Sequence, residues 1–201
     1  MLIRAHDDAS TDEARWRAFV AKQGFGHLVA AGRDRLVPVV VPTQFILDDD
    51  RLILHLSRSN PVFKCLAEND QCLLSVAGDW AYIPGSWRVT PDEDPRMGIP
   101  TTYYAAVQLT GSAVVTDGPD ATADVLRAQL GATEPDGDYV DPTQHSQRLG
   151  AIRGLTISIT EVRAKFKYGN NADVAHRSNV ADHLAERGSA GDTNARSQIQ
   201  L

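Results

Sequence analysis

The feature that most constrains the fold is a series of short apolar segments separated by turn residues. Each segment is rich in Val, Ile, Leu or aromatic residues, and several alternate apolar with polar positions. Repeated short strands of this kind are typical of an antiparallel sandwich or barrel. The predicted strands cover residues 26–31, 36–47, 51–57, 71–78, 101–117 and 154–166. We therefore predict an α+β, mainly antiparallel domain, a barrel of about six or seven strands with peripheral helices.

Proline and glycine mark special positions within these strands. Pro38 and Pro42 indicate an edge position or a bulge, because proline cannot donate to a strand ladder. Gly111 interrupts the longest strand and predicts a bulge that bends it around a barrel corner. The loop 88–100 is rich in proline and acidic residues. Loops of this length are often functional.

Four helices are predicted around the barrel, over residues 11–23, 60–69, 119–130 and 172–187. Ser10 or Thr11 would cap the first helix. Asn60 would cap the second, with Pro61 at the first helical position. We predict a single domain over 1–188, with its barrel at 26–166. The low apolar content of 189–201 predicts a flexible tail.

Charge and hydropathy narrow the function classes. The 201 residues include 20 Lys+Arg and 26 Asp+Glu, a net charge of -6, with no run of five basic residues. Direct DNA binding is therefore not expected. No apolar run of membrane-spanning or signal-peptide length occurs, which predicts a cytoplasmic protein without a membrane segment. Cys65 and Cys72 match neither a disulfide framework nor a zinc motif, so both are expected to be buried.

Common catalytic signatures are absent from the sequence, including a Walker loop, GxGxxG, GxSxG and HExxH. Hydrolase and Rossmann functions are therefore disfavoured. The strongest local candidate is the strand–helix junction HLSRSNPVFK, residues 55–64. Its Ser57, Arg58, Ser59 and Asn60 offer hydroxyls, a guanidinium and a helix start to a phosphate or carboxylate. The alternative is a solvated capping turn.

Two residues at the ends of this junction are candidate iron ligands. Lys64 lies between apolar neighbours, and partial desolvation would lower its pKa and free its lone pair for a metal or a proton. Alternatively it extends into water. His55 could ligate iron or be a packed strand residue, and His176 could reach a partner subunit's pocket.

Aromatic residues gather around the loop 88–100. They would suit either the faces of a flat cofactor or the core of a dimer interface, and the two roles are compatible. The members of this group are Trp80, Tyr82, Trp87, Tyr103 and Tyr104.

Seven segments together resemble the PaiB-type FMN-binding split-barrel family, distant relatives of the pyridoxamine-phosphate oxidases, over nearly the whole chain. They are FGHLVAAG, VPVVVPTQF, LILHLSRSNPVF, GDWAYIPGSW, GIPTTYYAAVQLTG, IRGLTISITEVRAKFKY and AHRSNVADHLAERG. Members are commonly described as FMN-binding negative transcriptional regulators. The chain is most similar to the actinobacterial branch, which includes the haem-dependent piperazate synthases.

This resemblance implies a split β-barrel homodimer with the cofactor at the subunit interface. Its acidic groups would be met by Ser57, Arg58, Asn60 and their neighbours. The chain departs from the family pattern at Val40 and Gln44, where members often have histidine, and at Lys64, where they have a small residue. These departures favour haem b over FMN.

The resulting functional hypothesis is a piperazate synthase-like enzyme that forms the N–N bond of an amino-acid substrate, N5-hydroxy-L-ornithine, with loss of water. Arg88 or Arg96 would bind the substrate carboxylate. Alternatives are a PaiB-like FMN-binding regulator and a flavin- or haem-dependent oxidoreductase. The candidate catalytic residues are Lys64, His55, Tyr82 and Tyr104, with Lys64 and His55 also candidate iron ligands. The candidate cofactor-binding residues are Ser57, Arg58, Ser59, Asn60, Trp87 and His176.

Overall fold

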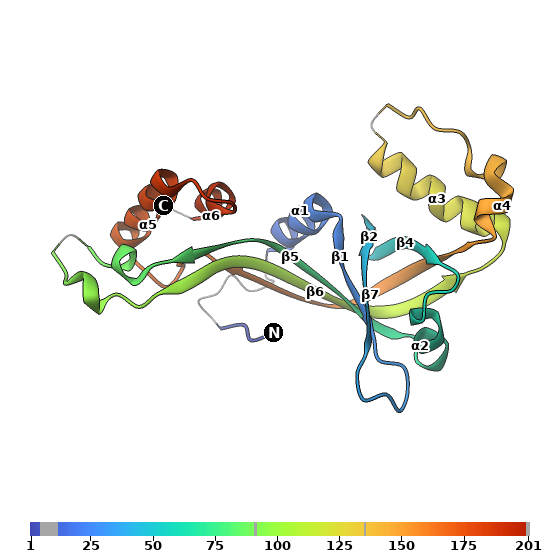
Figure 1. Ribbon diagram of the computed structural model, residues 1–201, viewed down its shortest axis with the longest axis horizontal. Helices are drawn as coiled ribbons and strands as arrows, with labels where there is room; N and C mark the ends of the chain where they lie inside the picture. The colour runs from blue at the N-terminus through green and yellow to red at the C-terminus, as the bar shows by residue number, and fades with distance from the viewer. Residues whose placement is uncertain (5–11, 91, 135, 200–201) are drawn as a thin grey trace. The chain divides into compact units, whose positions relative to one another are not determined.

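The structure is a computed structural model that describes residues 1–4, 12–90, 92–134 and 136–199 (Figure 1). Seven strands form one sheet in the order β2-β1-β5-β6-β7-β4-β3. The four strand pairs with a determined register are all antiparallel. The strands are β1 Phe25–Ala30, β2 Val39–Gln44, β3 Ile46–Asp48, β4 Arg51–Ser57, β5 Gln71–Ile83, β6 Thr101–Thr116 and β7 Ile152–Lys167.

The two ends of this strand order are joined by a very short connection. β2 and β3 are the outermost strands of the sheet, yet only Phe45 separates them in the chain. Phe45 is 2% exposed, so the connection itself lies in the core. The prediction of an α+β, antiparallel split barrel with helices is confirmed. Of the two prolines predicted to mark an edge or a bulge, Pro42 lies in β2, an outermost strand, which confirms the edge position, and Pro38 lies just before that strand.

The chain forms two compact units, and each is described by itself. Unit 1 comprises residues 1–16, 77–107 and 163–201, and unit 2 comprises 17–76 and 108–162. Whether 1–188 behaves as one domain, as the sequence predicts, stays a prediction. The helices are α1 Glu13–Gln23, α2 Val62–Glu68, α3 Pro119–Thr133, α4 Ser146–Leu149, α5 Val174–Arg187 and α6 Asp192–Gln198.

Unit 2 is built on strand alternation. In β4, Leu52, Leu54 and Leu56 are buried, while Ser57 at its end is exposed. β4 pairs with β7 so that His55 lies opposite Gly154. The apolar residues of this unit that are 0% exposed form its core. They are Val20, Leu28, Leu52, Leu54, Val62, Cys65, Leu74, Val76, Leu109, Ala123, Leu155 and Ile157.

Gly111 does not interrupt β6, which runs continuously through it. A Cβ at this position would lie 2.2 Å from the carbonyl oxygen of Ser158. The glycine therefore allows the β6 and β7 backbones to approach closely. The predicted interruption of the strand at Gly111 is wrong.

Unit 1 contains helices α5 and α6, which contact each other (Figure 1). The sequence predicts a flexible tail from residue 189, but α6 occupies 192–198 and buries Ala195. The first helix begins at Glu13, where Asp12 accepts a bond from the N–H of Arg15 at 3.0 Å. The predicted caps Ser10 and Thr11 lie outside the described residues.

Cys65 and Cys72 are buried and unpaired, as predicted. Burial raises the pKa of the Cys72 thiol to about 12. Within the described ranges, no cluster of three His, Cys, Asp or Glu side chains is placed to hold a metal ion. Among the same residues, no helix has the length and apolar character needed to cross a membrane.

Candidate functional site

The predicted site residues fall in both units. Those of unit 2 are His55, Ser57, Arg58, Ser59, Asn60 and Lys64, and those of unit 1 are Tyr82, Trp87, Tyr104 and His176. The candidates therefore form two sets, one in each unit, and each set has its own local geometry.

In unit 2, the junction between β4 and α2 displays two hydroxyls. Ser57 Oγ and Ser59 Oγ lie 3.0 Å apart, and both residues are exposed. The helix begins one residue later than predicted, with Pro61 rather than Asn60 as its cap residue. The Asn60 side chain still accepts a bond from the N–H of Val62 at 3.0 Å. The turn thus holds two hydroxyl groups side by side at the surface.

Arg58 is already paired within this junction. Its Nη1 and Nη2 donate to the two oxygens of Asp117 at 3.0 and 2.7 Å, and its Nε donates to the Gly150 carbonyl at 2.7 Å. The guanidinium holds the pKa of Asp117 below its usual range, and the carboxylate raises the pKa of Arg58. Arg58 therefore anchors the turn, and the serine hydroxyls are left to meet an anion.

His55 and Lys64 differ in how they are held. His55 Nδ1 lies 2.6 Å from Oε1 of Gln129, which is 6% exposed. An amide oxygen is an acceptor, so this contact is a hydrogen bond when Nδ1 carries a proton, and in that neutral tautomer the lone pair is on Nε2. Lys64 is exposed, so the predicted desolvation of its amine is not found in this chain.

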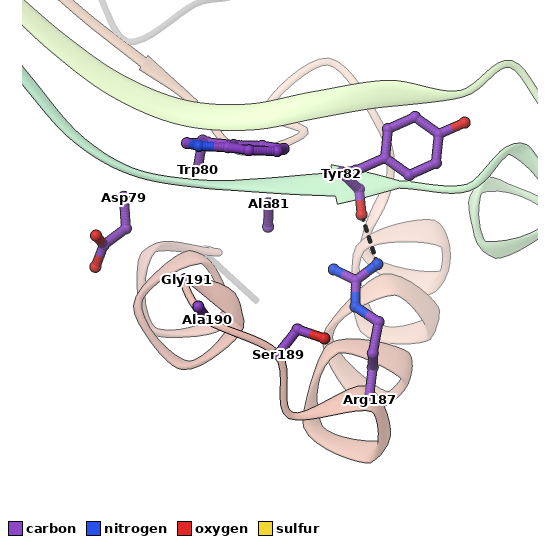
Figure 2. A pocket seen from close by; sticks show the side chains of 8 residues that line it. All are labelled: Asp79, Trp80, Ala81, Tyr82, Arg187, Ser189, Ala190 and Gly191. Carbon is purple, nitrogen blue, oxygen red and sulfur yellow. Dashed lines mark hydrogen bonds between the residues drawn. The ribbon is translucent and has the colours of Figure 1, made fainter.

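In unit 1, β5 presents two large aromatic side chains to solvent. Trp80 and Tyr82 are 64% and 50% exposed. Figure 2 shows them on one side of β5, with Asp79 and Ala81 on the other side, toward the 189–191 turn. These residues line a cavity of about 350 Å³ together with Arg187. Exposed aromatic faces of this kind suit a flat ligand or a partner surface.

Trp87 and Tyr104 have partners within unit 1. The Trp87 ring stacks on His183 at 4.9 Å, and the Arg187 guanidinium lies 4.7 Å from its centroid. Tyr104 is half-buried, with Lys167 Nζ 5.9 Å from its ring. Trp87 is therefore packed onto α5 in this chain.

His176 connects α5 to the loop that follows β5. Its Nδ1 lies 2.7 Å from Asp173 Oδ1, and its Nε2 lies 3.2 Å from Glu93 Oε2. Hydrogen bonding to Asp173, followed by the charges of both carboxylates, raises the pKa of His176. The pKa values of Glu93 and Asp173 are lowered, chiefly by backbone N–H groups and then by His176.

We expect this contact to depend on pH. A raised histidine pKa stabilises the contact below the unfolded value of about 6.5 and loses that contribution as pH rises through the folded value. The lowered carboxyl pKa values contribute above their unfolded values of about 4 and are lost in acid. The protection of the amides at the start of α5, measured by hydrogen exchange and corrected for the intrinsic exchange rate at each pH, should therefore be greatest near pH 5 to 6. His176→Gln should flatten this pH profile, and an unchanged profile in that variant would contradict the assignment.

A second cavity in unit 1 gathers residues that the sequence did not bring together. It measures about 210 Å³, and its charged lining residues are Arg4, Arg88 and Lys167. Arg88 Nη1 donates to the Ile99 carbonyl at 2.7 Å, and Lys167 Nζ donates to Thr101 Oγ1 at 2.7 Å. The sequence singled out Arg88 but gave no reason to join it to Lys167. Arg88 lies in the turn after β5, and Lys167 ends β7.

Most of the chain is similar to a known protein family. Residues 1–161 match the family described as "Putative FMN-binding domain". The chain belongs to this FMN-binding family. The predicted PaiB-type resemblance is thereby confirmed at the family level.

One sequence relative and two solved structures are similar to this FMN-binding family member over most of its length. The Bacillus subtilis "Protease synthase and sporulation protein PAI 2" is 25% identical over 192 residues, which cover 92% of this chain and 89% of that protein. The "FAD and Heme binding protein from Mycobacterium smegmatis" aligns with a TM-score of 0.64 at 21% identity, covering 91% of this chain and 82% of the other. The "Flavocytochrome Anf3 from Azotobacter vinelandii" gives 0.62 at 21% identity, with 91% and 77% covered.

The two structural likenesses establish the fold alone, because their identities are low. None of these three relatives is described as a piperazate synthase. The narrower resemblance to that branch therefore stays a prediction for this FMN-binding family member, as do its homodimeric assembly and the roles of individual site residues.

Proposed function

We propose that this protein binds FMN and acts as a flavin-dependent redox protein. The observation that carries this proposal is the match of residues 1–161 to an FMN-binding family. The regulatory alternative requires affinity for DNA, which the net charge of -6 does not favour. As the family resemblance implies, the active form would be a homodimer.

The residues present are compatible with FMN. Ser57 and Ser59 supply neighbouring exposed hydroxyls that would donate to phosphate oxygens. Arg58 would hold this turn in place through Asp117. When bound, FMN supplies one- and two-electron transfer.

Titration of the apoprotein with FMN tests this proposal through flavin fluorescence. Saturable binding is expected, and the double variant Ser57→Ala/Ser59→Ala should weaken it about thirtyfold, since each of the two lost hydrogen bonds costs about 1 kcal/mol. Ser158→Ala is the matched control, because Ser158 is an exposed serine on β7 away from the junction. Folded wild-type protein that binds no FMN would refute the proposal, and equal losses in the double variant and the control would refute the role of the two hydroxyls.

Haem is the second candidate cofactor, and His55 is the observation that favours it. Its Nδ1–H donates to buried Gln129, which leaves Nε2 able to accept a metal or a proton. The narrower hypothesis, N–N bond formation in N5-hydroxy-L-ornithine, depends on haem. A Soret band after incubation with haem, followed by formation of the dehydrated cyclic product, would support it. Flavin bands without a Soret band would reject it.

A further inference from the structure

We propose that the cavity lined by Arg88 and Lys167 in unit 1 is a binding site for a small anion, the carboxylate or phosphate group of a small molecule other than the flavin. This cavity is named the cationic pocket. The remaining lining residues that supply polar side chains are Arg4, Thr101, Tyr103, Tyr168, Asn170 and Asn171.

Among the described residues, the charged side chains that line the cationic pocket are all cations. They are Arg4, Arg88 and Lys167. An anion that enters the pocket would make charge-assisted hydrogen bonds with such donors.

The Arg88 guanidinium is held in place by one hydrogen bond, and its other N–H groups donate to no partner among the described residues. A guanidinium carries five N–H groups, and one of them donates to the Ile99 carbonyl. Among the described residues, no carboxylate pairs with Arg88. Arg96 in the same loop differs, because it binds both oxygens of Asp94, with its Nη2 2.6 Å from Oδ2. Arg58 and Arg187 are paired in the same way, with Asp117 and Asp192. Arg88 is thus positioned as a cation without its own counter-ion.

Neutral donors complete the pocket. Tyr103 is 2% exposed, and burial raises the pKa of its hydroxyl, which therefore remains a donor at neutral pH. A Cβ at Gly169 would lie 2.2 Å from this hydroxyl, so the glycine, at φ +82, makes room for it. Asn171 lines the same wall. Two cations, a phenol and an amide are a donor set that suits oxyanions.

The size of the pocket limits the ligand. About 210 Å³ is below the roughly 300–1,000 Å³ typical of sites for larger organic ligands. An adjoining cavity of about 330 Å³ shares Arg88, Tyr103 and Asn171 and also contacts His176. The anionic group would therefore lie in the cationic pocket, with room for the rest of a small molecule beside it.

The test uses inorganic phosphate and acetate as ligands, with binding followed by amide chemical-shift changes at constant ionic strength. Saturable shifts are expected around residues 99–103 and 167–171. Arg88→Gln should weaken binding by at least about tenfold, since it removes charge-assisted hydrogen bonds. Arg96→Gln is the matched control, because it removes a cation from the same loop that already has a carboxylate partner.

Four outcomes would overturn the inference. Three belong to the titration: the absence of saturable binding to the folded wild type, unchanged binding in Arg88→Gln, and an equal loss in Arg96→Gln. The fourth comes from a separate competition experiment, in which FMN displaces phosphate from the wild type but not from Arg88→Gln. The last result would mean that the pocket holds the flavin phosphate. Because the titration is done without flavin, failure of FMN binding would remove the proposed function and leave this site standing.

Discussion

Arg187→Ala should destabilise the α5–α6 region by about 3 to 5 kcal/mol, the cost of leaving a buried carboxylate without its cation. Asp192 is 1% exposed and receives Nε and Nη2 of Arg187 at 2.8 and 2.6 Å. Arg187 Nη1 also donates to the Tyr82 carbonyl at 2.8 Å, so this one side chain ties α5 to α6 and β5 (Figure 2). Its removal leaves the Ser189 N–H as a partner of the carboxylate.

The measurement is native-state hydrogen exchange of the α6 amides, which reports local opening directly. Arg196→Ala is the control, because Arg196 is an exposed arginine on α6. The double variant Arg187→Ala/Asp192→Ala should lose less than the sum of the single variants. An opening free energy for Arg187→Ala equal to that of the control would show that the ion pair does not hold α6.

Gly98→Ala should disrupt the loop that carries Arg88 and weaken anion binding by about tenfold or more, as an overpacked contact forces the backbone to move. A Cβ at Gly98 would lie 1.9 Å from the Gly85 carbonyl oxygen, which leaves no space for a methyl group. Ile99, the next residue, holds the Arg88 guanidinium through its carbonyl. A displaced backbone at position 98 therefore moves the support of Arg88.

Phosphate titration of Gly98→Ala, with circular dichroism to confirm the fold, checks this expectation. Gly131→Ala is the matched control, because a Cβ at Gly131 would have only the Tyr139 hydroxyl, at 3.9 Å, within 4 Å. Wild-type phosphate affinity in Gly98→Ala would mean that the Gly85–Gly98 contact does not position Arg88.

Local pattern predicted much of the fold. The apolar segment RLILHLS predicted β4, and Asn60-Pro61 marked the start of the short helix to within one residue, since the helix begins at Val62. These features depend on neighbouring residues, which a sequence displays. The helix α6 could not be predicted in this way, because it depends on Asp192 meeting Arg187 and on Gly191 fitting against the Trp80 carbonyl.

The candidate site was predicted less completely for the same physical reason. The sequence around Arg58 suggests that its guanidinium is free to bind a phosphate. In the structure it is paired with Asp117, which lies 59 residues away in the chain. Arg88 and Lys167 lie far apart in the chain, so their common cavity depends on tertiary structure that local sequence does not display. Lys64 shows the limit of local context, since its apolar neighbours turn inward while its own side chain is exposed.

The most direct test of the central claim is the visible absorption spectrum of the protein after incubation with FMN and gel filtration. We expect flavin bands to co-elute with the protein at about one FMN per chain, because a bound nucleotide survives removal of free ligand when its affinity is high. Folded protein that elutes without flavin, or that retains only haem when both cofactors are offered, would contradict the account.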